Sequence, residues 1–359
     1  MALAAALVLG RRGLSVALQA GAGFAAAPAR ADVRTYALNE ASVALLQSLR
    51  VWDAIPADAR TAVLDMRVEG DAPGAVLDFS AWSQGLTALA WIVDAAELES
   101  ALRAAVRFSP QVHPVADQDT SAALLVLAEG RQSATRERLG VRMPIHGYGQ
   151  LGLAARLEGD VPHAGLARQW FRSPDVLALL PFDRPAAGRS HGLVWSLPEA
   201  RAQALMALPA AAFEQALMDA TGGAAGPLRL ASERATWPLA MALADPVCGP
   251  GWVLLGDAAH LVHPLAGQGL NLGLADVAAL EAVVAEREPW RPVGDERLLR
   301  RYARRRAAPT RAMARLTDGL LHLFENQTPV MRELRNRGLT LVNHLPPVKR
   351  WLGASARLG

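Results

Sequence analysis

The stretch GWVLLGDAAHLVHPLAGQGLNLGLADVAAL, residues 251–280, decides how this chain folds. It opens with a short apolar run, Trp252 to Leu255, which is typical of a buried strand and stops at Gly256. Asp257 follows, and a glycine-rich segment then leads into a long apolar helix. Such a strand–turn–helix favours anions, because free backbone N–H groups and the positive end of the helix dipole meet at the helix start. The pattern predicts a site for a phosphorylated ligand.

Particular residues in this stretch suit such a ligand. Gly267 and Gly269 would let the backbone approach a flat or phosphorylated group closely. The carboxylate of Asp257 offers acceptors for sugar-like hydroxyls. A Gly-Asp pair alone is more often ordinary packing after a strand, so it is the length of the whole run that favours a binding site.

The run resembles the second flavin fingerprint of the single-component flavin aromatic hydroxylases, the para-hydroxybenzoate hydroxylase family. Its longer form, GDAAH…HPLAGQGLNLGL…D, is similar to the ubiquinone-biosynthesis branch of that family. The resemblance implies that Asp257 binds the ribityl chain of FAD and that the segment after it lies against the pyrophosphate and the flavin. The cofactor-binding residues implied here are Gly256, Asp257, Pro264, Ala266, Gly267, Gln268, Gly269, Leu270 and Asn271.

Two further segments resemble motifs of the same family. Residues 32–42, DVRTYALNEAS, resemble D-x-R-x-x-A-L-x-x-x-S, which implies that Arg34 lies near the flavin. Residues 128–136, AEGRQSATR, resemble A-D-G-x-x-S-x-x-R with Glu129 in place of the aspartate. That resemblance implies that Glu129 and Gly130 contact the flavin pyrophosphate region and the nicotinamide nucleotide. Taken alone, the first segment would be a solvent arginine before a helix and the second a common turn.

The N-terminal segment MALAAALVLGRRGLSVALQ resembles the first helix and second strand of a dinucleotide-binding βαβ unit. In relatives a strand and a G-x-G-x-x-G turn precede that helix, so we expect about 20 residues of the unit to lie before Met1. Gln19 stands where the family has the acidic residue that holds the adenosine ribose, and its amide bonds a hydroxyl less strongly than a carboxylate does. A secretory signal is disfavoured, because the positive charges at Arg11 and Arg12 follow the apolar stretch.

The length of 359 residues suggests two domains or one large α/β unit with an insertion. Strand-like runs between His146 and Trp195 suit an antiparallel sheet that floors a substrate pocket. The resemblance implies an α/β fold: a Rossmann-like FAD-binding domain of the para-hydroxybenzoate hydroxylase type, with an inserted antiparallel-sheet substrate domain and a C-terminal helical tail. The expected ranges are 1–60, 86–142 and 249–295 for the FAD-binding domain, 61–85 and 143–248 for the substrate domain, and 296–359 for the tail.

Composition excludes several other classes of protein. Cys248 is the only cysteine, so the chain can form no intramolecular disulfide or thiolate cluster, which fits a cytoplasmic location. The net charge of +3 and the lack of interleaved aromatic and basic residues argue against nucleic acid binding. The pair His260-x-x-His263 has the wrong spacing for a helical zinc site, so we expect no metal. The sequence contains no uninterrupted run of 18 apolar residues, so we expect no membrane-spanning helix.

The function that the resemblance implies is that of an FAD-dependent monooxygenase which uses NAD(P)H and O2 to hydroxylate a polyprenylated phenol in ubiquinone biosynthesis. The cofactor supplies the chemistry, so no acid–base catalyst is named. The Arg-dense helix expected at Leu298–Arg315 and the apolar tail after it favour contact with the inner face of the membrane or with a quinone-biosynthesis complex. Two alternatives are a non-catalytic accessory or scaffold subunit that keeps the fold, and a hydroxylase with a small soluble substrate.

Overall fold

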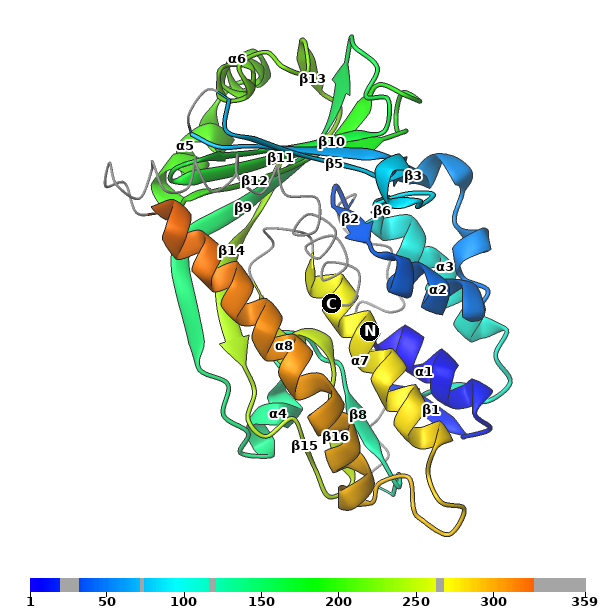
Figure 1. Ribbon diagram of the computed structural model, residues 1–359. Helices are drawn as coiled ribbons and strands as arrows, with labels where there is room; N and C mark the ends of the chain where they lie inside the picture. The colour runs from blue at the N-terminus through cyan, green and yellow to red at the C-terminus, as the bar shows by residue number, and fades with distance from the viewer. Residues whose placement is uncertain (20–31, 72–73, 116–120, 263–267, 326–359) are drawn as a thin grey trace.

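The computed structural model describes residues 1–19, 32–71, 74–115, 121–262 and 268–325, with side chains described as far as Gly319 (Figure 1). Within this part, a large sheet lies at one end of the molecule, and a helical layer built on smaller sheets lies at the other (Figure 1). The binding site is formed where the two meet.

The large sheet has nine strands in the order β17-β14-β9-β12-β11-β10-β4-β5, with β13 paired to β9. Their bounds are β4 Asp65–Glu69, β5 Val76–Ser80, β9 Ile145–Gly159, β10 Leu166–Arg172, β11 Asp175–Phe182, β12 Ser190–Pro198, β13 Leu228–Leu230, β14 Ala235–Leu243 and β17 His260–Leu261. Most pairs are antiparallel, as the sequence predicts, but β10 and β4 run parallel.

Two helices, α5 Glu199–Ala207 and α6 Ala210–Thr221, cover the outer face of this sheet (Figure 1). Successive side chains of a strand point to opposite faces. Leu193 and Trp195 of β12 therefore bury themselves against Phe213 and Leu217 of α6. The residues between them, such as Val194, are left for the inner face, which lines a cavity.

The other half is built on parallel strand pairs. Strand β1 (Val16–Gln19) runs parallel to β7 (Val112–Val115), and β8 (Leu125–Leu127) runs parallel to β16 (Trp252–Leu254), which also pairs with β15 (Cys248–Gly249). A small antiparallel sheet of β2 (Thr35–Leu38), β6 (Ala90–Asp94) and β3 (Arg60–Val63) lies beside them. The helices of this half are α1 Ala2–Arg11, α2 Glu40–Ser48, α3 Ala95–Arg107 and α4 Ala134–Arg138.

Helix α7, Gln268–Ala285, runs through the middle of this half. It is long and apolar enough to cross a bilayer by length and composition. Its apolar residues, however, belong to the main core cluster together with those of α1, which identifies a core helix. Helix α8, Glu296–Glu325, is longer than the expected Leu298–Arg315 and contains Pro309. It packs against the sheet of β15 and β16, where the hydroxyl of Tyr302 donates a 2.9 Å hydrogen bond to the carbonyl of Leu254.

The predicted fold class is confirmed: the chain is α/β, with a large, mainly antiparallel sheet set against a parallel-stranded nucleotide-binding half. The pattern Asp94-x-x-Glu97 before an apolar helix predicts a capping box, and the Asp94 carboxylate does accept from the backbone N–H groups of Ala96 and Glu97 at the start of α3. Glu97 does not complete a reciprocal capping box, because its carboxylate bonds Arg184 instead. The residue ranges of the two domains stay a prediction.

Candidate functional site

A cavity of about 780 Å³ lies between the N-terminus of α7 and the inner face of the large sheet. Its walls come from both halves of the molecule. The nucleotide-binding half contributes Arg34, Gly130, Gly256, Asp257 and the start of α7 from Gln268 to Asn271, whereas the large sheet contributes side chains from β4, β5, β10, β11, β12 and β14. The cavity thus brings together most of the residues that the sequence singled out.

The turn after β16 presents Asp257 to this cavity. Gly256 begins the short 3-10 helix η4, Gly256–Ala258, with φ +58°, a left-handed conformation that favours glycine. A Cβ there would lie 2.7 Å from Cγ of Met1, so the Met1 side chain would have to shift to make room for one. Asp257 lines the cavity, but most of its carboxylate is surrounded by protein and not by water. This burial raises the pKa of Asp257, and His260 opposes the shift.

A buried charge network holds that turn from behind. The Asp276 carboxylate is fully buried and accepts from the N–H of Gly256 at 2.9 Å, from Nε2 of His260 at 2.7 Å and from Nε of Arg306 at 2.7 Å. Burial alone would raise its pKa, but His260, Arg306 and the Gly256 amide hold the pKa of Asp276 below its usual range. The network joins η4, α7 and α8, so the C-terminal helix helps to position Asp257.

The first turn of α7 forms the cavity wall next to Asp257. Among the described residues, a Cβ added at Gly269 would meet no atom within 4 Å outside its own helix backbone, which leaves this side of the turn open to a ligand. Asn271 lines the cavity too, but its amide is engaged within the protein. Its Oδ1 accepts from the N–H of Asn39 and the hydroxyl of Ser42, and its Nδ2 donates to the carbonyl of Ala37. Asn271 therefore fastens α7 to β2 and α2.

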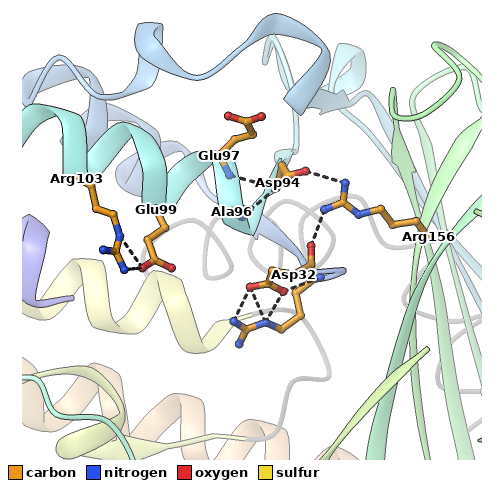
Figure 2. Close-up of polar contacts among 8 residues, drawn as sticks. Asp32, Asp94, Ala96, Glu97, Glu99, Arg103 and Arg156 are labelled. Atoms are coloured by element: carbon orange, nitrogen blue, oxygen red, sulfur yellow. Dashed lines mark hydrogen bonds and ion pairs between the residues drawn. The ribbon is translucent and has the colours of Figure 1, made fainter. Parts of the chain in front are cut away.

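Arg34 enters the cavity wall from the segment before β2, and Asp32 fixes its orientation. The Asp32 carboxylate accepts from Nε and Nη2 of Arg34 at 2.9 and 2.7 Å. Figure 2 shows that Arg156, which extends from β9 of the large sheet, reaches the same segment. Its guanidinium donates to the Asp32 carbonyl at 2.9 Å and pairs with the Asp94 carboxylate at 2.8 Å. One arginine thus links the two halves beside the cavity.

Glu129 lies away from the cavity that its neighbours line. Its carboxylate accepts from the hydroxyls of Ser133 and Thr135 and from the N–H of Thr135, so it closes the turn that starts α4. Gly130, at φ +77°, and Arg131 line the cavity instead. The resemblance therefore identifies a turn that does line the cavity. The sequence did not reveal that the Glu129 carboxylate binds within this turn and does not face the cavity.

The sheet side of the cavity is largely apolar. Its lining includes Met66, Phe79, Val176, Leu180, Val194 and Leu239, with Gln169 and Ser196 as polar members. The segment Trp237-Pro238-Leu239 lies here on β14, next to an irregularity in its pairing with β9. A wall of this kind suits a hydrophobic ligand that carries few polar groups.

The remaining expectations concern residues outside the described part of the chain. Pro264, Ala266 and Gly267 of the flavin fingerprint, and His263 of the histidine pair, fall there. Among the described residues no group of three or more His, Cys, Asp or Glu could hold a metal ion. The predicted cofactor-binding residues did not include Asp276 or Arg306, which position the turn of Asp257 from behind. Asp276 is the aspartate that ends the motif GDAAH…HPLAGQGLNLGL…D, so the motif contained a signal for it.

The cavity fits a flavin nucleotide on its own geometry. Asp257 offers a carboxylate that makes no hydrogen bond with any described residue and can accept from a ribityl hydroxyl, and Gly269 leaves backbone open beside it. The volume lies within the range of about 300–1,000 Å³ found for small-molecule sites. Asp257, Arg34 and the start of α7 would hold the cofactor, and the apolar sheet would receive the second substrate.

Comparisons with known proteins agree with this geometry. Residues 80–317 match the FAD binding domain family. The chain is 31% identical over 339 residues to ubiquinone hydroxylase UbiL of Rhodospirillum rubrum, covering 89% of this chain and 78% of the relative. It is 30% identical over 346 residues to the 3-demethoxyubiquinol 3-hydroxylase of Escherichia coli, covering 90% and 87%.

Among solved structures, p-nitrophenol 4-monooxygenase PnpA of Pseudomonas putida has a TM-score of 0.73 and 16% identity, covering 99% of this chain and 93% of that one. At that identity the likeness shows a shared fold. The family match and the two relatives at 30–31% identity also assign the chain to a protein family. The chain therefore belongs to the FAD-binding-domain family and, within it, to the FAD-dependent hydroxylases of ubiquinone biosynthesis.

Proposed function

We propose that this chain hydroxylates the aromatic ring of a polyprenylated phenol, with FAD as cofactor and NAD(P)H and O2 as co-substrates. The main support for the proposal is that Asp257 and the start of α7 line the same cavity as the apolar face of the large sheet. A hydrophobic phenol placed on that sheet would lie next to a flavin held by Asp257. The relatives named as a ubiquinone hydroxylase and a demethoxyubiquinol hydroxylase support a quinone precursor as substrate.

FAD, when bound, would supply redox chemistry in which NAD(P)H provides two electrons, one oxygen atom of O2 enters the ring and the other is released as water. The residues of this chain supply the environment for that chemistry. The N-terminus of α7 places the positive end of a helix dipole at the cavity wall, where it would stabilise negative charge on a ligand. The apolar side chains of Phe79, Val176 and Leu180 would exclude water from the reacting ring.

We also propose that the protein works in the cytoplasm, at the inner face of the membrane or in a quinone-biosynthesis complex. Helix α8 supports this. Arg297, Arg304, Arg311 and Arg315 are exposed at spacings of seven, seven and four residues, which place them on one helical face. The arginines between them are neutralised, Arg300 by Glu296 and Arg301 by Glu288. A basic stripe of this kind suits an anionic surface.

The test is turnover by the full chain with added FAD. The protein is incubated with NADH or NADPH, O2 and a prenylated phenol, and the product is analysed by mass spectrometry. The proposal expects a product heavier by one oxygen atom, formed more efficiently from the prenylated phenol than from the same phenol without its chain. A protein that binds FAD but oxygenates neither compound would favour the accessory-subunit alternative. Equal efficiency with both phenols would favour a small soluble substrate.

A further inference from the structure

Small side chains form a flat floor on the inner face of the large sheet. Val194 of β12 pairs with Ala178 of β11 on one side and with Ala154 of β9 on the other. All three residues line the cavity. Because their side chains are short, a planar group can lie close against these strands, in an apolar setting of the kind that small-molecule sites use. The floor of Ala154, Ala178 and Val194 therefore suits the aromatic ring of a substrate.

A serine hydroxyl lies at the edge of this floor. Side chains alternate between the two faces of a strand, so Ser196 shares the inner face with Val194 and also lines the cavity. Across the sheet, Ser196 lies between Val176 and Gly152. The indole of Trp237 lies over Gly152, since a Cβ added there would be 3.0 Å from that ring. The Ser196 hydroxyl is thus set between an aliphatic and an aromatic part of the cavity wall.

The hydrogen bonding of Ser196 differs from that of a second buried serine on the same strand. Ser196 is 3% exposed, yet its hydroxyl makes no hydrogen bond with any residue that the structure describes. Oγ of Ser190, in contrast, donates to the carbonyl of Ala186 at 2.9 Å and accepts from the N–H of Ala186 at 2.8 Å. A buried hydroxyl that lacks a hydrogen bond costs free energy, which a ligand with a matching polar group would recover.

From this arrangement we infer that Ser196 is a specificity-determining residue, whose hydroxyl forms a hydrogen bond with the ring hydroxyl of the phenol. The inference rests on the proposed function, because it requires the aromatic substrate to lie on the floor of Ala154, Ala178 and Val194. A serine hydroxyl both donates and accepts, as a phenolic hydroxyl does, so the two can pair without the burial of a charge. A ring of the same shape without the hydroxyl would leave Ser196 unpaired, so the site should discriminate against it.

The experiment measures how the full chain, with added FAD, binds two ligands. One is a prenylated phenol, and the other is the same prenylated benzene without the hydroxyl. Isothermal titration calorimetry gives both dissociation constants for the wild type, for Ser196→Ala and for Ser196→Thr, which keeps a hydroxyl. Ser190→Ala is the matched control, because it removes a buried hydroxyl from the same strand at a position that does not line the cavity. Denaturant unfolding is recorded for each variant.

The two serine-to-alanine variants should behave in opposite ways. Ser196→Ala should weaken binding of the phenol about five- to tenfold and change binding of the hydrocarbon by less than about twofold. Its unfolding midpoint should stay unchanged, because no described residue loses a hydrogen bond. Ser190→Ala should lower the unfolding midpoint and leave both affinities unchanged, because its hydroxyl bonds only the protein. Ser196→Thr should weaken phenol binding less than Ser196→Ala does.

The inference is overturned if Ser196→Ala weakens binding of both ligands by the same factor, or changes phenol binding by less than about twofold. It is also overturned if the wild-type protein does not bind the phenol. Failure of the proposed function looks different. In that case the wild-type protein would bind the phenol, and lose affinity at Ser196→Ala, but would form no hydroxylated product from it.

Discussion

The carboxylate of Asp276 and the guanidinium of Arg306 lie 2.7 Å apart, both almost wholly buried, directly behind the turn that carries Asp257. They come from α7 and α8, 30 residues apart in the sequence. Arg306 also donates to the carbonyl of Leu272. The contact therefore couples the C-terminal helix to both segments that face the cofactor side of the cavity.

Removing Arg306 should destabilise the protein strongly. Arg306→Met would leave the Asp276 carboxylate buried without its cationic partner, which we expect to cost about 3 kcal/mol of unfolding free energy. Denaturant unfolding measures this. The control is Arg305→Met, whose half-exposed guanidinium pairs with Glu286 at the surface and should cost less than about 1 kcal/mol. Equal losses in both variants would show that the buried pair has no special role.

Adding a methyl group at Gly269 should separate stability from binding. A Cβ there meets no atom of the described residues within 4 Å outside its own helix backbone, so Gly269→Ala should leave unfolding unchanged or stabilise the helix by up to about 1 kcal/mol. The same methyl group would occupy space that the cofactor needs, so FAD affinity should fall at least about tenfold. Gly319→Ala on α8, which also meets no atom, is the control and should leave FAD affinity unchanged. An unchanged affinity in Gly269→Ala would place the cofactor elsewhere.

FAD binding should depend on pH through Asp257. The ionised carboxylate is the better acceptor for a ribityl hydroxyl, so affinity should be full above the pKa of Asp257 and fall as pH drops through it. Because burial raises this pKa, the loss should begin at a higher pH than an ordinary aspartate would give. Titrations of FAD at several pH values test this. Asp257→Asn should bind more weakly at neutral pH and lose the dependence, and a wild-type curve identical to that of Asp257→Asn would rule out this role.

The double role of Asp94 can be divided by two substitutions. Asp94→Asn keeps an acceptor for the cap of α3 but loses the ion pair with Arg156, whereas Asp94→Ala loses both. We expect Asp94→Asn to cost about 1–3 kcal/mol and Asp94→Ala about 1 kcal/mol more, which is the typical contribution of an N-cap. Thermal or denaturant unfolding gives both values. Equal stability of the two variants would mean that the cap contributes nothing.

Local sequence pattern predicted the elements that carry a short-range signal. The apolar run before Gly256, the cap at Asp94 and the strands between His146 and Trp195 all appear in the structure. These features are encoded within a few neighbouring residues, as alternation, a capping side chain or a glycine.

What the sequence left unresolved depends on contacts between distant segments. The pairing of Asp276 with Arg306 and the bonds of Asn271 to the segment around Asn39 join residues 30 and 232 positions apart, and no local pattern encodes them. Glu129 shows a second limit. Its position in the motif was evident, but only the fold reveals that its carboxylate binds Thr135 and Ser133, the N-cap residue of α4, while Gly130 and Arg131 line the cavity.

The measurement that tests the central claim most directly is a titration of the purified full chain with FAD, followed by flavin fluorescence and by the absorbance of bound flavin at about 450 nm. The account predicts saturable binding of one FAD per chain that is weakened by Gly269→Ala and Asp257→Asn and unaffected by Gly319→Ala. Binding that is absent, or equally strong in all four proteins, would contradict it.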